Sequence, residues 1–99
     1  MRFPTVVLML ALLPLSAAAS TEEAWEEFRA QVRDACAALV QAPEGARVGI
    51  EVNPFGSESH GAALVTVGHE TGEDRMICIF DKRAGTAELT APFDPAGTR

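Results

Sequence analysis

The spacing of the apolar residues changes once along this chain, at the segment Pro43-Glu44-Gly45. Before this segment, from Trp25 to Leu39, apolar side chains recur every three or four positions, which is the period of an amphipathic helix. After it, from Arg47 onwards, apolar and polar residues alternate, as they do in strands with one buried face. A chain with this order can form a helix followed by strands, which is an α+β fold.

The helix is expected over residues 21–41. Ser20 is followed three positions later by Glu23, which is the pattern of a capping box, and more glutamates lie in the first turns, where the helix dipole favours negative charge. The expected apolar stripe consists of Trp25, Phe28, Val32, Ala35, Cys36 and Leu39. This stripe gives the helix one face to bury against the strands, and we interpret Trp25 as part of that core.

Four strands are expected after the change of period, over residues 47–52, 61–68, 75–80 and 86–90. Residues 71–74 and 82–85 have turn chemistry and separate the last three of these strands. Short connections favour antiparallel neighbours, so we predict a four-stranded antiparallel meander with the N-terminal helix packed on it, in two layers. Residues 91–99 contain two prolines and are expected to run as an extended C-terminal tail, with Phe93 as its anchor.

The first nineteen residues have the three parts of a secretory signal peptide. A positive charge is followed by an apolar run from Thr5 to Leu15 and by the small residues Ser16 to Ala19. The run is shorter than the roughly 20 apolar residues that a membrane-spanning helix needs. We therefore expect cleavage before Ser20, a single mature domain over residues 20–99, and a periplasmic or secreted location.

The mature chain is acidic and poor in large apolar side chains. Of the 80 residues after position 19, 33 are hydrophobic and 13 of these are alanine. The same 80 residues hold 14 acidic and 7 basic side chains, which gives a formal charge of −7. Nucleic acid and anionic lipid attract proteins through clusters of Lys and Arg, whereas the basic residues here stand singly apart from Lys82-Arg83. We expect neither partner, and the charge favours a cationic one.

The two cysteines of the mature chain, Cys36 and Cys78, are expected to form one disulfide bond. An exported protein folds in an oxidising compartment, and the two residues do not form the C-x-x-C motif of redox sites. Cys36 lies on the helical stripe and Cys78 lies in the apolar run 76–80, so the bond would join the helix to the third strand. By chain-entropy arguments, closing this loop stabilises the fold by about 4 kcal/mol, which is large for a small domain with a thin core.

The expected disulfide also assigns a face of the sheet to each residue of the third strand. If Cys78 faces the helix, Ile77 and Ile79 face away from it, because side chains alternate along a strand. One helix covers only one face of a sheet. Two interpretations of the second face stay open: the Phe93 tail or the Phe55 loop folds over it, or it binds a protein partner or a second copy of the chain.

The longest connection between strands, residues 53–61, holds most of the candidate interaction residues, namely Phe55, Ser57, Glu58 and His60. Such loops often carry recognition. Phe55 is either an exposed aromatic anchor for a partner or a plug at the end of the core. Serine, histidine and glutamate together suggest a hydrolytic site, but side chains that are consecutive in sequence rarely converge on one point. We therefore expect that the protein is not an enzyme.

The histidines offer little for a metal site. His60 and His69 bracket the second strand, and at about 3.3 Å per residue their backbones lie roughly 30 Å apart. A weak cation site could form from His69, Glu70 and either Glu73 or Asp74 in the following turn. A solvated acidic turn is the simpler interpretation, so no metal or cofactor is expected.

These features predict a small secreted, non-enzymatic protein that acts as a protein-binding or accessory module, with a cationic protein as its partner. One concrete form is an inhibitor of a basic cell-wall hydrolase. The alternative is a periplasmic protein that binds a small ligand or a metal. A helix followed by a meander with an Asp-x-x-x-Gly hairpin, here Asp81 to Gly85, is similar in architecture to several families of small periplasmic domains.

Overall fold

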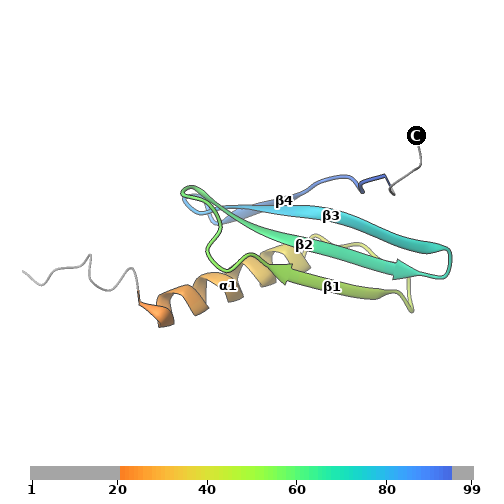
Figure 1. Cartoon of the computed structure of the whole chain (residues 1–99), viewed down its shortest axis with the longest axis horizontal. Coiled ribbons are helices and arrows are strands. Elements are labelled where there is room, and N and C mark those ends of the chain that lie inside the picture. Colours follow the sequence, from red (N-terminus) through yellow and green to blue (C-terminus); the bar gives the residue numbers. More distant parts are fainter. Residues whose placement is uncertain (1–20, 95–99) are drawn as a thin grey trace, which may run out of the picture.

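The computed structural model describes residues 21–94, which form one helix packed on a four-stranded sheet (Figure 1). The elements are α1 (Glu22–Ala37), β1 (Arg47–Val52), β2 (His60–His69), β3 (Gly72–Asp81) and β4 (Thr86–Leu89). Each strand pairs antiparallel with the next, in the order β1-β2-β3-β4. The predicted α+β class and meander are confirmed, while the predicted signal peptide lies outside the described residues.

The first turn of α1 is capped by Thr21, while Ser20, the cap residue expected from the sequence, lies outside the described residues. Thr21 Oγ1 accepts a hydrogen bond from the backbone N–H of Ala24 at 3.0 Å, which makes Thr21 the N-cap residue and places Ala24 three positions into the helix. The capping box predicted with Glu23 at that position is therefore wrong. Serine and threonine both cap helices well, so the local sequence Ser-Thr does not decide between the two starts.

The helix ends at Ala37, earlier than the apolar spacing predicted. After the C-cap residue Ala38, the N–H groups of Leu39 and Val40 bond to carbonyls only three positions back, which is the tightened geometry of a last turn. Leu39 consequently leaves the stripe and is 38% exposed, while Val40 packs against the core in its place. The chain has to turn here because Cys36 is fixed against the sheet while β1 still has to be reached.

The hairpin between β2 and β3 has a shorter turn than the sequence predicted. Glu73 and Asp74 were expected in the turn, but they pair with Gly68 and Val67 in the strand ladder. His69 pairs with Gly72, so only the two residues between them form the loop. A two-residue loop is the commonest connection in hairpins, and it lets polar residues continue a strand at the exposed end of the sheet.

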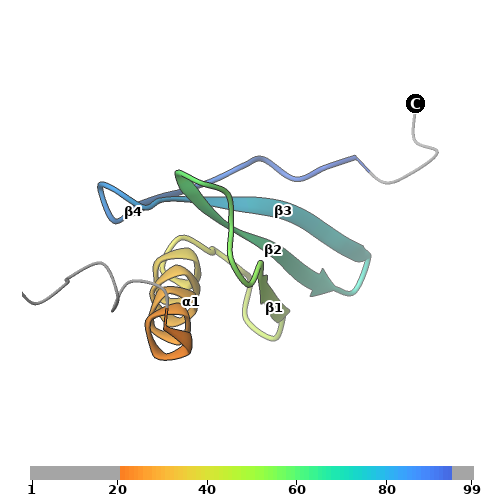
Figure 2. The same ribbon diagram turned by 60° about the vertical axis from the view of Figure 1, so that its left-hand side comes forward.

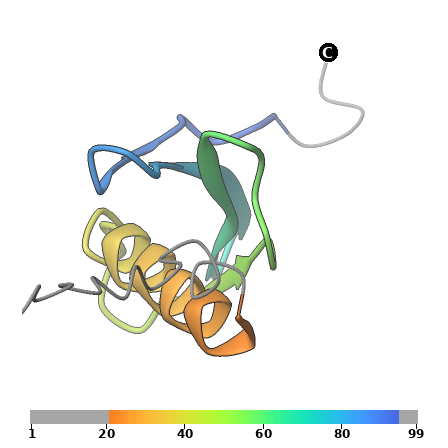
Figure 3. The same cartoon turned by 90° about the vertical axis from the view of Figure 1, so that its left-hand side faces the viewer.

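The core lies between α1 and one face of the sheet, which we call the inner face (Figures 2 and 3). Its buried members are Val32, Cys36, Ala63, Val65, Val67, Met76, Cys78 and Phe80. The predicted disulfide is confirmed: Cys36 and Cys78 are bonded, fully buried, and 5.9 Å apart at their Cα atoms. Gly61 lets the helix approach closely, because a Cβ there would lie 2.9 Å from side-chain atoms of both Phe28 and Val32.

The hairpin between β3 and β4 is held by the side chain of Asp81. Asp81 Oδ1 accepts hydrogen bonds from the N–H groups of Arg83 and Ala84, both at 2.9 Å, and Gly85 closes the turn with φ +74°. The two N–H groups favour the ionised carboxylate and hold the pKa of Asp81 below its ordinary value, the bond from Ala84 contributing most.

Replacing Asp81 by Asn should remove a pH-dependent part of the stability. A carboxyl group with a lowered pKa in the fold stabilises the protein above its unfolded pKa, and that contribution disappears as the pH falls through the lower folded pKa. We expect wild type to melt above Asp81→Asn near neutral pH, and the difference to shrink in the acid range below about pH 4. Thermal unfolding of both proteins from neutral pH to pH 2 measures it, and a difference that stays constant with pH would contradict the role of this carboxylate.

The other face of the sheet, which we call the outer face, is partly exposed in the described part of the chain. Within residues 21–94, Leu64 and Ile79 on this face are 37% and 38% exposed. The segment after β4 instead follows the edge of β3, where the N–H of Phe93 bonds to the carbonyl of Arg75 at 2.8 Å. Its anchor is thus the main chain, since the Phe93 ring is 54% exposed. The Phe55 ring packs on the helix side, so the interpretation in which the Phe55 loop covers the outer face is wrong. Residues 95–99 of the tail lie outside the described residues, so the interpretation in which the tail covers this face is not tested beyond residue 94.

Candidate functional site

Residues from three distant segments meet where the loop between β1 and β2 approaches the first turns of α1. Trp25 and Phe28 come from the helix, Phe55 from the loop, and Lys82 from the turn after β3; we call these four residues the aromatic tip. The Phe55 and Trp25 rings lie 4.9 Å apart in an edge-to-face arrangement, and Trp25 and Phe28 lie 5.7 Å apart in the same way. Edge-to-face contacts are favourable because the positive ring edge meets the negative ring face.

The aromatic tip is joined to the core of the protein. The Phe28 ring lies 6.2 Å from the ring of the buried Phe80, also edge to face. Trp25 is only partly buried and is not among the hydrophobic residues that pack against the core, so the core role predicted for it is wrong. Its ring lies between Phe28 and Phe55 and supports the loop.

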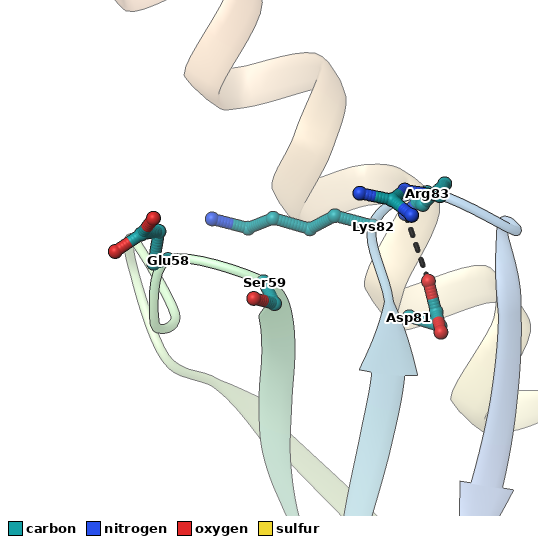
Figure 4. Close-up of a pocket in the computed structure, with 5 residues that line it drawn as sticks. All are labelled: Glu58, Ser59, Asp81, Lys82 and Arg83. Atoms are coloured by element: carbon teal, nitrogen blue, oxygen red, sulfur yellow. Dashed lines mark hydrogen bonds between the residues drawn. The ribbon is translucent and has the colours of Figure 1, made fainter.

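Lys82 fixes the loop from one side. Its Nζ donates hydrogen bonds to the carbonyl oxygens of Phe55 at 3.2 Å and Ser57 at 2.6 Å. The same ammonium group lies 4.9 Å from the ring centre of Phe28 and 5.5 Å from that of Trp25, within the range of cation–π attraction. In Figure 4 the side chain extends from the turn after β3 towards the loop that carries Glu58. This role could not be predicted from the sequence, because Lys82 lies 25 or more positions from its partners.

Arg29 fixes the loop from the other side. Its Nη1 donates to the carbonyl oxygen of Pro54 at 3.0 Å, its Nη2 lies 3.2 Å from Glu22 Oε2, and the guanidinium lies 5.9 Å from the ring centre of Phe55. Arg29 and Lys82 thus hold three carbonyl groups of this loop, those of Pro54, Phe55 and Ser57. Such a loop loses little further freedom when it binds a partner.

The loop also closes on itself. Asn53 Oδ1 accepts hydrogen bonds from the N–H groups of Phe55 and Gly56 at 3.3 and 2.8 Å. Gly56 has φ +69°, and a Cβ there would overlap the carbonyl oxygen of His60. This position therefore requires glycine both for its left-handed backbone and for the close approach of the chain.

The serine and histidine of the loop meet through the main chain. Ser57 Oγ accepts from the N–H of His60 at 3.1 Å and donates to the His60 carbonyl at 3.3 Å, and the N–H of Ser57 bonds to the same carbonyl at 2.7 Å. The hydroxyl group thus closes the loop. Glu58 lines an open depression of about 650 Å³ at this end of the molecule, together with Ser59, Asp81, Lys82 and Arg83 (Figure 4).

The structure divides the predicted interaction residues between two surfaces. Phe55, Ser57 and Glu58 lie on the loop at the aromatic tip. His60, Ile77 and Ile79 lie on the outer face, since the residues that alternate with them, such as Gly61 and Cys78, face the helix. His60 and Ile79 line a second, smaller depression there, with Asp81, Thr86 and Glu88.

The turn considered for a weak cation site brings two of its members together. His69 Nε2 lies 3.5 Å from Asp74 Oδ2, and His69 Nδ1 lies 3.0 Å from Thr71 Oγ1. Between residues 21 and 94, no three His, Cys, Asp or Glu side chains gather as a metal site would require. No helix in this part of the chain is long and apolar enough to cross a membrane.

Comparison with known proteins adds no relative. The chain matches no protein-family model, no curated protein and no solved structure. The aromatic tip and the outer face are therefore interpreted from their own geometry and charge.

Proposed function

We propose that this protein is a secreted, non-enzymatic binding module that holds a cationic protein through its aromatic tip. The observation that carries this proposal is the exposure of Phe55 on an ordered loop. Its ring is 54% exposed, although the loop beneath it is fixed by Arg29, by Lys82 and by the edge of Trp25. Holding an apolar ring in water on a fixed loop costs free energy in the isolated protein, and contact with a partner recovers it.

An aromatic side chain in this setting has the properties of a binding hot spot. Most of the binding free energy at protein interfaces comes from a few residues, and aromatic ones are enriched among them. Phe55 also has only two side-chain torsions to fix, and its loop is already ordered by the two cations. Its ring therefore suits the role of an anchor that enters a pocket of the partner.

The charge around the tip favours a basic partner. Glu22, Glu23 and Glu26 are exposed on the first turns of α1, and Glu58 is exposed on the loop. Three cations lie at this end: Lys82 faces carbonyl groups and rings, Arg29 pairs with Glu22, and Arg83 lines the depression beside Glu58. The carboxylates still outnumber them, because Glu23, Glu26 and Asp81 lie here as well. Opposite charge speeds association and selects among partners. An exported basic enzyme, such as a cell-wall hydrolase, fits this requirement, and the disulfide suits an oxidising compartment.

Binding should be lost when the Phe55 ring is removed. The mature protein, immobilised, is used to capture a partner from periplasmic extract at low and at high salt, and the captured protein is then titrated against Phe55→Ala. We expect Kd to rise at least about tenfold, as for a hot-spot residue, with little change in melting temperature. Phe93→Ala is the matched control, because the Phe93 ring is equally exposed, at 54%, but lies away from the tip.

Three results would contradict the proposal. The first is unchanged affinity in Phe55→Ala, and the second is an equal loss in Phe93→Ala, which would point to general stickiness of exposed rings. The third is a partner that binds as tightly at high salt as at low salt, which would remove the charge argument.

A further inference from the structure

The outer face has an ordered arrangement of side chains across its strands. The pairing register aligns Glu51, Leu64 and Ile77 in one cross-strand row, and Ala62, Ile79 and Glu88 in the next. These two rows form an apolar centre with one carboxylate at each outer edge. Leu64 and Ile79 remain more than a third exposed in the described part of the chain.

The rows on either side of this centre carry opposite charges. One row contains Thr66 and Arg75, and the row at the other end contains His60 and Asp81. Arg75 is exposed, and Asp81 lines the depression that also contains His60 and Ile79. The row beyond Arg75 holds Arg47 and Glu73, one charge of each sign, and so adds no net charge. Arg75 therefore lies on one side of the apolar centre and Asp81 on the other, where His60 and Arg83 are close to the Asp81 carboxylate.

We infer that the outer face binds a second copy of this chain, with the strands of the two sheets antiparallel. A two-fold axis that lies across the strands, between the two apolar rows, places each apolar row on the other. The same rotation places Arg75 opposite Asp81 of the second copy, and Asp81 opposite its Arg75. Interfaces of this kind are self-complementary, because one patch meets itself.

The alternative two-fold axis, along the strands, is disfavoured by charge. It would place Arg75 beside Arg75 and Asp81 beside Asp81, and like charges in contact are repulsive. In the antiparallel arrangement each strand stacks on its own copy, so Glu88 meets the position of Thr90 and Glu51 meets the position of Asn53, and the two carboxylates stay at opposite edges of the face. Charge thus selects one of the two ways in which the apolar rows could stack.

The size of the outer face fits a reversible dimer. Four strands about 4.8 Å apart and rows about 6.8 Å apart give a footprint on the order of 600 Å² for each copy. Two copies would then bury roughly 1,200 Å², at the lower end of specific interfaces. Sheets packed face to face lie about 10 Å apart, which suits side chains of the size of Leu and Ile.

Sedimentation of the mature protein over a concentration series tests this inference. We expect wild type to shift from monomer to dimer at high micromolar concentration. Ile79→Asp should abolish the dimer and leave a folded monomer, because Ile79 lies outside the core. Leu39→Asp is the matched control, since Leu39 is equally exposed at 38% but lies after the end of α1, and it should still dimerise.

The charge pairing is tested separately with Arg75→Glu and Asp81→Asn. Both should weaken the dimer at least about fivefold at low salt and less at high salt, and Asn at position 81 keeps an oxygen for the hairpin. These variants also decide the matter if Ile79→Asp fails to fold, since both leave the apolar rows intact. Phe55→Ala should dimerise normally. A failure of the dimer inference can therefore be distinguished from a failure of the proposal that the aromatic tip binds a partner.

Two outcomes would overturn the inference. If the wild-type protein stays monomeric up to the highest concentration, the outer face does not bind a second copy, and a different protein would be its partner. A dimer that survives both Ile79→Asp and Arg75→Glu would place the contact elsewhere.

Discussion

The double substitution Cys36→Ala, Cys78→Ala should lower the free energy of unfolding by about 4 kcal/mol. The bond closes a loop with a sequence separation of 42 residues, and a cross-link over that length removes much of the freedom of the unfolded chain. The effect is large here because only eight hydrophobic residues among those described are buried, two of them the cysteines themselves. A small domain of this kind has a total stability of only several kcal/mol.

Urea denaturation of the oxidised protein, of the protein kept reduced and of the double variant measures this contribution. The last two should agree with each other and fall well below the first. An unchanged midpoint after reduction would contradict the role given to the bond. Single cysteine variants are less suitable, because a free thiol can pair with a second molecule.

Phe80→Ala should cost about 3–5 kcal/mol, the range for removing a large aromatic side chain from a core. Phe80 is 2% exposed and is the largest of the fully or nearly fully buried side chains. It also supports Phe28, whose ring contacts both Trp25 and the ammonium group of Lys82. We therefore expect faster hydrogen exchange in the loop at residues 53–60 as well as a lower denaturation midpoint.

The comparison for this prediction is Phe55→Ala, which removes the same side chain from a position that is 54% exposed. It should cost less than about 1 kcal/mol, because little buried area is lost. Equal losses from the two variants would mean that the Phe55 ring belongs to the core. Phe80→Leu, which fills most of the volume, should retain a large part of the stability but lose the edge-to-face contact with Phe28.

The elements that could be predicted are those whose pattern is local. The period of the apolar residues identified the helix and every strand, and the bounds of β1 agree with the prediction because Gly45 on one side and Asn53-Pro54 on the other flank a clean alternation. Errors arose at the ends of elements. The cap moved from Ser20 to Thr21, the helix lost its last turn, and the turn after His69 shortened, because tertiary pairing decides each of these ends.

The candidate site shows the opposite situation. Phe55 was recognisable from its loop, but the residues that fix it were not. Lys82 is 27 positions from Phe55, and Arg29 is 25 positions from Pro54. Contacts of a cation with carbonyl oxygens leave no local pattern in a sequence, and these segments come together through the register of β2 and β3 and through the packing of α1 on the sheet.

The disulfide between the two layers also affects when the chain can fold. In a reducing environment both thiols are free and the chain lacks the stabilisation of about 4 kcal/mol that the bond supplies. The core that remains is thin, so the reduced chain spends more of its time unfolded. The bond between Cys36 and Cys78 thus makes the completion of folding depend on oxidising conditions.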